Sequence, residues 1–460
     1  MPEWRRNDTD DMKRFYPSLL LLLLSCVPPA RPVDAPAPSP VARRLTAQDD
    51  QLLDDLSRRS FRYFWEQSGP DTGLTLDRAR ADGSPHDERH RRTGSIAATG
   101  FALTATCIAA ERGWVPAGAA RERVANTLRF FADRAFHKNG WFYHWMDVAS
   151  GERLWRSEVS SIDTALLLAG VLTARQYFSS DSEIVELATR IYNRIDFRWM
   201  LNGHPTLLSH GWTPEGGFIR NRWDNYSEHT ILYFLAIGSP THPISARSWY
   251  AWTRDLNRYP GFRFIGNAPL FTHQYSQAWI DYRGRRENQG SRIDYFANSV
   301  TATRAHRQFC LDLRSRFPGY SEDLWGITAS DSPNGYVAWG GPPAQGPIDG
   351  TVVPCAAAGS LMFAPELCMP VLRKFREGFG DRIYGRYGFV DAFNPTLDWV
   401  GTDVVGIDIG ITLVSAENAR TGRVWRWFMA NREIPAAMDK VGLRRVRLDE
   451  RQRQPEQSFF

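Results

Sequence analysis

The sequence lacks the short motifs that identify several large enzyme classes. It has no G-x-S-x-G string, which excludes the nucleophile elbow of the α/β-hydrolases. It has no G-x-G-x-x-G or Walker pattern, which argues against a cradle for phosphate groups. The ten histidines form no H-E-x-x-H string and no loop has EF-hand spacing, so neither a metal nor another cofactor is expected.

Charge of one sign is also scarce. The formal net charge is +5 over 460 residues, and the basic residues form no stripe with interleaved aromatic residues. A nucleic-acid partner is therefore not expected. The chain is 43% hydrophobic and 23% charged, which is typical of a globular protein with a large core.

Long apolar runs are absent apart from a short one near the N-terminus. Residues 19–24 are apolar, follow the basic pair Lys13-Arg14, and are too few to cross a bilayer. The following Leu-Leu-Ser-Cys string, which ends at Cys26, resembles a bacterial lipobox. A plain secretory signal cleaved near Cys26 is the alternative. Either way the mature chain is expected in the cell envelope, facing the periplasm or the outside. In the lipobox interpretation Cys26 is its only membrane anchor.

Cysteine is rare as well, with five residues in the chain. Cys107, Cys310, Cys355 and Cys368 remain once Cys26 is set aside. Four cysteines permit three disulfide pairings, and an oxidising compartment allows them. Most lie inside apolar runs, so buried free thiols are an equal alternative.

Aromatic residues, in contrast, are abundant. They make up 13% of the chain and include 17 tryptophans. A buried indole N–H needs a hydrogen-bond partner, so a core seldom uses this many. Sugar-binding clefts do, because pyranose faces stack on flat apolar rings.

Helical apolar spacing recurs in pairs of segments joined by short turns. In each pair the first segment is apolar on nearly every side, and the second carries a charged face, which predicts one buried and one outer helix. About six such pairs and an extra N-terminal helix predict an all-α fold, an (α/α)6 barrel whose long aromatic loops share one face. The expected helices span 47–67, 95–112, 117–135, 160–178, 182–200, 226–237, 244–256, 293–316, 354–363, 365–379, 408–418 and 421–431.

Acidic residues begin almost every predicted inner helix. Capping explains any one of them, since carboxylates favour helix N-termini. As a set in an aromatic cleft they suit glycoside hydrolysis, which needs one carboxylic acid and one carboxylate. The acids at these helix starts are Glu158, Asp163, Asp224, Glu228, Asp294, Asp349, Asp403 and Asp408.

Several long strings resemble the bacterial glucoamylase-like family, which includes endo-β-1,2-glucanases and is related to a domain of cyclic β-1,2-glucan synthases. They are HGWTPEGGF, WDNYSEHTILYFLAIGSPTHP, LFTHQYSQAWIDYR, WGITASDSPNGY, DGTVVPCAAAGS and YGRYGFVDAFNP, and the resemblance covers residues 48–442. It implies an (α/α)6 barrel that cleaves β-1,2-glucan with inversion and needs no cofactor. It also implies Glu228 as general acid, and Glu158, with Asp163 beside it, as a second functional acid; Glu158 and Asp408 remain alternative bases.

The expected domains are a signal peptide at 1–26, a Pro/Ala-rich tether at 27–45, the catalytic barrel at 46–442 and a basic tail at 443–460. We expect a monomer whose partner is a polysaccharide or oligosaccharide. Alternatives are a non-catalytic glycan-binding lipoprotein, an enzyme for another glucan linkage, or a lyase. The acid-lined mouth argues against the anionic substrate of a lyase. The residues expected to bind sugar are Trp145, Trp155, Trp212, Asp224, Tyr226, Gln274, Trp325, Asp331, Trp339 and Asp403.

Overall fold

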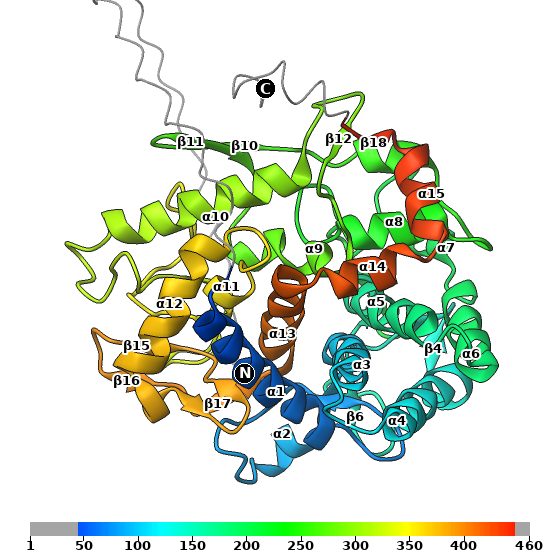
Figure 1. Cartoon of the computed structure of the whole chain (residues 1–460). Coiled ribbons are helices and arrows are strands. Elements are labelled where there is room, and N and C mark those ends of the chain that lie inside the picture. Colours follow the sequence, from blue (N-terminus) through cyan, green and yellow to red (C-terminus); the bar gives the residue numbers. More distant parts are fainter. Residues whose placement is uncertain (1–44, 447–460) are drawn as a thin grey trace, which may run out of the picture. The chain divides into compact units, whose positions relative to one another are not determined.

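Six helices that are buried along almost their whole length form an inner ring (Figure 1). In the computed structural model, which describes residues 45–446, α3 packs on α5, α5 on α8, α8 on α9, α9 and α11 on α13, and α13 back on α3. The ring is therefore closed. Its members are α3 (Ile96–Glu111), α5 (Ser161–Tyr177), α8 (Thr230–Gly238), α9 (Tyr275–Trp279), α11 (Pro354–Ala358) and α13 (Gly406–Arg420).

A second set of helices surrounds this ring, each with one polar face. Residues 45–446 belong to one compact unit, and the architecture is the predicted (α/α)6 barrel. The outer helices are α1 (Ala47–Glu66), α4 (Ala117–Arg129), α6 (Ser182–Asn193), α10 (Tyr295–Asp312), α12 (Pro365–Gly378) and α15 (Glu433–Lys440). Three further helices are α2 (Glu88–Arg92), α7 (Phe197–Met200) and α14 (Arg423–Met429).

The inner helices α3 and α5 approach each other unusually closely. A Cβ atom on Gly100 would lie 2.1 Å from the carbonyl oxygen of Leu166, and one on Gly170 would lie 2.1 Å from that of Gly100. Real Cβ atoms do not come this close to backbone, so only glycine fits at either position. The two glycines thus set the spacing of the ring at this point.

Short strands lie in the loops between the helix pairs. They form two three-stranded sheets, β1-β3-β6 and β7-β8-β9, and six two-stranded ones. The strands are β1 (Thr75–Leu76), β2 (Arg78–Arg80), β3 (Thr93–Ser95), β4 (His137–Lys138), β5 (Trp141–Phe142), β6 (Trp145–Asp147), β7 (Val159–Ser160), β8 (Gly211–Thr213), β9 (Gly217–Phe218), β10 (Leu256–Tyr259), β11 (Phe262–Ile265), β12 (Arg285–Glu287), β13 (Tyr384–Gly385), β14 (Gly388–Phe389), β15 (Phe393–Asn394), β16 (Trp399–Val400), β17 (Asp403–Val405) and β18 (Leu443–Arg445).

Several predicted helix boundaries are wrong. Residues 244–256 form only a 3₁₀ turn, Ala246–Tyr250, because Thr253 pairs through its backbone with Asp224 and Tyr226 instead of continuing a helix. The outer position beside α8 is taken by α15, which was not predicted. The inner helix α9 lies in a predicted loop, and α10 has no break near residue 300. The barrel also continues past residue 442, since β18 pairs with β12.

The cysteines that follow Cys26 are buried. Within residues 45–446, all the cysteines are free thiols: Cys107, Cys310, Cys355 and Cys368. Of the two alternatives, disulfides and buried free thiols, the structure has the free thiols. No helix in this part of the chain combines the length and apolarity needed to cross a membrane. The predicted lipobox, the tether up to residue 44 and the tail from residue 447 lie outside the described residues.

Candidate active site

One wall of the candidate site holds a histidine between two carboxylates. His144 Nδ1 lies 3.0 Å from Glu158 Oε1, and its Nε2 lies 3.5 Å from Asp163 Oδ1. Burial opposes the protonation of His144, but Asp163 and Glu158 together raise its pKa above the ordinary value. Burial likewise opposes ionisation of Glu158, yet the histidine lowers its pKa. The three groups therefore form an ion triad with a charged imidazolium at its centre.

Local structure fixes the two acids of this triad. Glu158 directly precedes β7, which pairs with β8 beneath it. Asp163 lies in the first turn of α5, where the helix-capping residue Ser160 accepts from its N–H at 3.2 Å and donates its hydroxyl to Oδ2 at 2.5 Å. Asp163 is thus part of the N-terminal cap of α5, as the capping interpretation allows.

Glu228 is the acid that capping does not explain. α8 begins at Thr230, later than predicted, so Glu228 lies in the preceding loop. The Ser227 hydroxyl donates to Glu228 Oε2, and the Ser276 hydroxyl to its backbone carbonyl. Burial, and then the nearby charge of Asp163, raise the pKa of Glu228, while part of its surface remains open. A partly exposed carboxyl group with a raised pKa is suited to proton donation.

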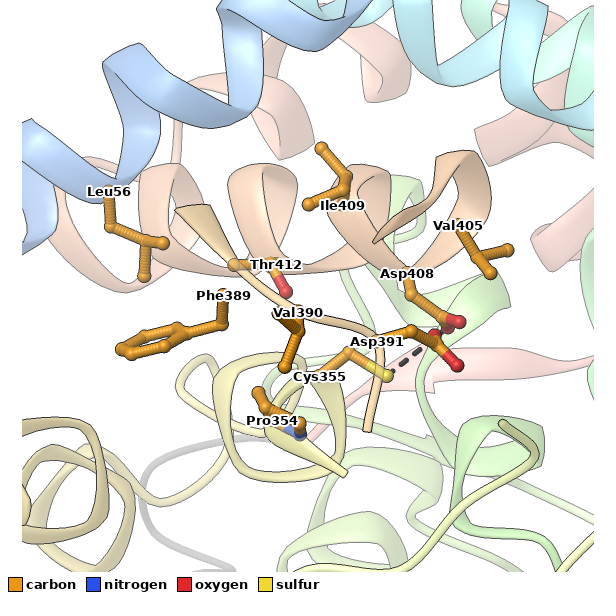
Figure 2. Close-up of a pocket in the computed structure, with 10 residues that line it drawn as sticks. All are labelled: Leu56, Pro354, Cys355, Phe389, Val390, Asp391, Val405, Asp408, Ile409 and Thr412. Carbon is orange, nitrogen blue, oxygen red and sulfur yellow. Dashed lines mark hydrogen bonds between the residues drawn. The ribbon is translucent and has the colours of Figure 1, made fainter. Parts of the chain in front are cut away.

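A second pair of acids lies at the start of α13 (Figure 2). Asp408 is 5% exposed, and its Oδ1 accepts from Cys355 Sγ at 3.2 Å and from the Tyr275 hydroxyl at 3.4 Å. Asp391, from the loop after β14, is also buried, and its Oδ2 accepts from the Asp331 N–H at 2.7 Å. Asp391 Oδ1 and Asp408 Oδ2 have no other donor among residues 45–446.

These two carboxyl groups share a proton. Burial and the charge of Asp408 hold the pKa of Asp391 well above its ordinary value, and the two side chains hydrogen-bond to each other. Burial raises the pKa of Asp408 to about 6, although hydrogen bonds from Asp391, Cys355 and Tyr275 moderate the rise. At neutral pH Asp391 is therefore the protonated donor and Asp408 the carboxylate.

The acid pair and the ion triad are electrostatically linked. Burial raises the pKa of Tyr275, and the charges of both Asp408 and Glu228 add to this effect, so Tyr275 lies within electrostatic reach of both acids. Asp77 links the same two groups, since it adds to the raised pKa of His144 and forms an ion pair with Arg78, which borders the acid pair. Glu228 and Asp408 therefore belong to one electrostatically coupled region at the starts of the inner helices.

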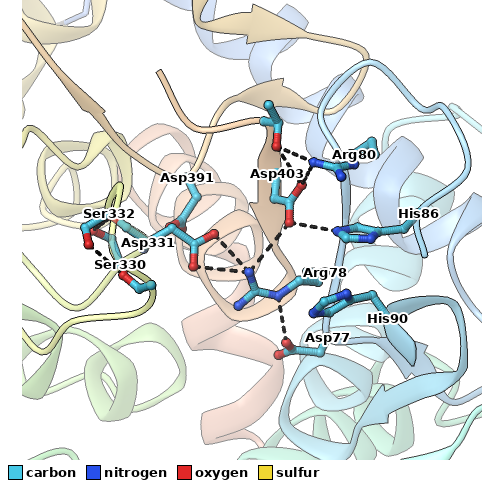
Figure 3. A network of polar contacts seen from close by, with 12 residues as sticks. Asp77, Arg78, Arg80, His86, His90, Ser330, Asp331, Ser332, Asp391 and Asp403 are labelled. Carbon is cyan, nitrogen blue, oxygen red and sulfur yellow. Dashed lines mark hydrogen bonds and ion pairs between the residues drawn. The ribbon is translucent and has the colours of Figure 1, made fainter. Parts of the chain in front are cut away.

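An arginine network borders the acid pair (Figure 3). Arg78 Nη1 donates to both oxygens of Asp331, at 3.1 and 2.9 Å, and lies 3.6 Å from Asp403 Oδ2. β17 pairs with β2 so that Asp403 stands opposite Arg80, whose Nη1 donates to Asp403 Oδ1 at 3.0 Å. Asp331 and Asp403, both predicted to bind sugar, therefore serve first as partners of these arginines.

Three predicted tryptophans lie at the rim of the cleft. Trp145 stacks on His144 with centroids 3.9 Å apart, and Trp155 lies 5.8 Å from Trp145. Trp155 is 45% exposed, and the Arg89 guanidinium lies 4.4 Å from its ring centroid. Trp212, on β8, is partly exposed and packs on Trp199. Asp224 is exposed and lines an open hollow that reaches Ser227.

Four predicted sugar-binding residues are buried in the structure. The Gln274 amide is fully enclosed and donates to Ala356 O and Ser360 Oγ, which ties α9 to α11. Trp325 is completely buried, and the Trp339 indole donates to Ser330 inside its own loop. Tyr226 stacks on Tyr295 in the core, and burial raises its pKa to about 12. Aromatic composition alone does not separate cleft from core.

Residues 220–432 match the sequence family Glycoamylase, described as "Putative glucoamylase". The crystal structure of a putative glucoamylase from Bacteroides uniformis is 30% identical, with a TM-score of 0.80 over 88% of this chain and 99% of that one. The chain belongs to the glucoamylase-like family. As a member of that family it keeps the (α/α)6 barrel over nearly the whole described region.

Two relatives of this glucoamylase-like chain have named activities. An endo-β-1,2-glucanase from Chitinophaga pinensis, solved with sophorotriose and glucose, is 27% identical with a TM-score of 0.80, over 87% of this chain and 99% of that one. The exo β-1,2-glucooligosaccharide sophorohydrolase of Parabacteroides distasonis is 27% identical over 432 residues, 85% of this chain. The chain spans 58% of the length of that curated relative.

Proposed function

We propose that this protein hydrolyses β-1,2-glucan or its oligosaccharides with inversion at the anomeric carbon. The observation that carries the proposal is Glu228: a partly exposed carboxyl group with a raised pKa, which lies, like Asp408, within electrostatic reach of Tyr275. Inverting glycosidases use two carboxyl groups, an acid and a base, separated by the space of a water molecule.

In the proposed reaction Glu228 gives its proton to the glycosidic oxygen as the bond to the anomeric carbon breaks. Water attacks the opposite face of the sugar and loses a proton to Asp408. The pKa of about 6 suits Asp408 to a base at neutral pH, and the Tyr275 hydroxyl at 3.4 Å offers a relay to its buried oxygen. Both acids return to their starting states when the product leaves.

The ion triad of His144, Glu158 and Asp163 supports Glu228 as the general acid and does not itself donate the proton. Asp163 contributes to the raised pKa of Glu228, so the proton is held until the leaving oxygen needs it. His144 lowers the pKa of Glu158, and its two ring nitrogens hold Glu158 and Asp163 in place. Because Glu158 lies on the same side of the site as the proposed acid Glu228, we assign the role of general base to Asp408.

The linkage is supported by the two relatives named above, which act on β-1,2-linked glucans. The test is a panel of β-1,2-, β-1,3-, β-1,4- and α-1,4-glucans with product sizing and NMR of the first product anomer. We expect sophorooligosaccharide products with α configuration from the β-1,2-glucan alone. Turnover of another linkage, or a β anomer formed first, would contradict the proposal.

The base assignment has its own test. Asp408→Asn and Glu158→Gln are compared with and without sodium azide, a small nucleophile that needs no general base. We expect azide to restore turnover of Asp408→Asn and to yield an inverted glycosyl azide. Rescue of Glu158→Gln instead would move the base to the ion triad.

We also propose that the protein is a monomeric lipoprotein held in the cell envelope through Cys26. The proposal is supported by the basic, apolar and lipobox-like order of residues 12–26. A Cys26→Ser variant should move from the membrane fraction to the soluble fraction on cell fractionation. A variant that stays with the membranes would contradict the lipid anchor.

A further inference from the structure

A second cluster of titratable side chains lies at the rim of the cleft, outside the acid pair and the triad. It is formed by His86 and Asp87, which lie between β2 and α2, and by His90 in α2; Figure 3 shows the two histidines. Each offers one donor atom, and these atoms lie within 4.8 Å of one another. Asp87 Oδ2 is central, 3.2 Å from His86 Nδ1 and 2.6 Å from His90 Nδ1.

The protonation state of His86 follows from its partners. The Asp87 backbone N–H donates to His86 Nδ1 at 2.8 Å, so this nitrogen carries a lone pair and no proton. The proton is therefore on Nε2, which lies 2.9 Å from Asp403 Oδ2 and donates to it. A histidine held by a carboxylate at one nitrogen, with a lone pair at the other, is the usual state of a metal ligand.

The spacing of the three donors is close to that of a metal site. Two ligands at tetrahedral angles on Zn²⁺, with bonds of about 2.0–2.1 Å, lie about 3.3 Å apart. The 3.2 Å between His86 Nδ1 and Asp87 Oδ2 already matches this value, and the 2.6 Å between His90 Nδ1 and Asp87 Oδ2 has to lengthen by less than an ångström.

We propose that His86, Asp87 and His90 bind a divalent transition-metal ion, with Zn²⁺ the best match to two imidazoles and one carboxylate, and with water at the open position. The ion would replace the Asp87 N–H at His86 Nδ1. Solvent reaches the site, since the Asp87 and His90 side chains are 55% and 27% exposed, while His86, at 7%, is anchored against β17.

The bound ion would hold together the segments that form the rim of the cleft. His86 connects through Asp403 to Arg78 and Arg80. On the other side, the neighbouring Arg89 lies over the exposed Trp155 ring. A metal that joins His86 to His90 would therefore fix the loop that positions Arg89 on Trp155.

The test is Zn²⁺ titration of chelator-treated full-length protein by calorimetry, with Co²⁺ absorption as a second readout. We expect one site with a dissociation constant in the micromolar range or below, and a rise in melting temperature on Zn²⁺ addition. His90→Ala should weaken binding at least tenfold, and Asp403→Asn by about 10- to 100-fold. Glu88→Gln, an exposed acid beside the site, should bind as the wild type does.

The His144, Glu158 and Asp163 triad also has donors within 4.8 Å, so it is the competing site. A Glu158→Gln variant separates the two. Binding retained in Glu158→Gln and lost in His90→Ala supports the rim site. Binding lost in Glu158→Gln and kept in His90→Ala, or no Zn²⁺ binding by the wild type, overturns it. None of these readouts depends on turnover, so the proposed glucanase activity is tested separately.

Discussion

The carboxyl groups of Asp391 and Asp408 hydrogen-bond to each other, so at neutral pH one of them carries a proton. Asp391 thereby donates to the proposed base and moderates the effect of burial on it. Removing the Asp391 donor should change the pH at which Asp408 ionises. The size of this change should depend on which residue replaces Asp391.

We expect Asp391→Ala to move the acidic limb of the kcat/KM profile from about pH 6 to higher pH, by about one unit. The Asp408 carboxylate would then be buried with one donor fewer. Asp391→Asn should leave the limb near pH 6, because its amide still donates to Asp408. Profiles between pH 4 and 9 decide this; an unmoved limb in both variants would remove Asp391 from the control of the base.

Stability should depend on pH through the same pair. Asp408 has a pKa of about 6 in the fold, against an ordinary 3.8, so its contribution is complete below pH 3.8 and is lost as pH rises through 6. Asp408→Asn has no such loss. Relative to wild type, its free energy of unfolding should improve by up to about 3 kcal/mol between pH 4 and pH 7. Urea denaturation at both pH values measures this, and a constant difference would argue against the raised pKa.

Glu228→Gln should fold normally and lower kcat by about 10²- to 10⁴-fold, the usual contribution of a general acid. The amide keeps the shape of the side chain and has no proton to give. Glu186→Gln, an exposed acid on α6, is the matched control and should be fully active. A substrate with a good leaving group, such as an aryl sophoroside, should lose much less, and an equal loss on both substrates would argue for a binding role.

Gly100→Ala should destabilise the barrel by about 1–3 kcal/mol, since the added methyl meets the Leu166 carbonyl and the helices cannot separate without opening the ring. Gly118→Ala in α4 is the control. Nothing lies within 4 Å of its Cβ position, so the substitution should be neutral or stabilising by up to about 1 kcal/mol. Thermal melts of both variants test the contrast; equal melting temperatures would contradict the close approach.

The helices that the sequence predicts well are those with a clear periodic pattern. α1, α3, α5 and α13 begin and end within two residues of prediction. α9 has five residues, too few for a period of 3.6 to be visible, and α11 ends at Ala358, before the predicted end at residue 363. The 244–256 segment has apolar residues at helical spacing, but backbone pairing with Asp224 and Tyr226 overrides that tendency.

The sequence indicates the candidate-site residues that stand near the start of a helix. It does not indicate those whose role depends on contacts between distant parts of the chain. Glu228, Glu158, Asp163 and Asp408 each stand near the start of an inner helix, so topology alone brings them to one mouth. Asp391 stands at no predicted helix start, and Arg78 reaches Asp331 across 253 positions, for which one sequence carries no pattern. The sequence does not separate buried from exposed tryptophans, because core and cleft use the same rings.

α14 packs against α5, α9 and α13 at the ends of the inner helices opposite the acids, with Trp425 and Phe428 buried beneath the ring. The barrel is therefore closed at this end and open only at the end that carries the long loops. A polysaccharide cannot thread through it and must lie across the loops at the open end. Both halves of a cut chain then have to leave by the route that the intact chain used to enter.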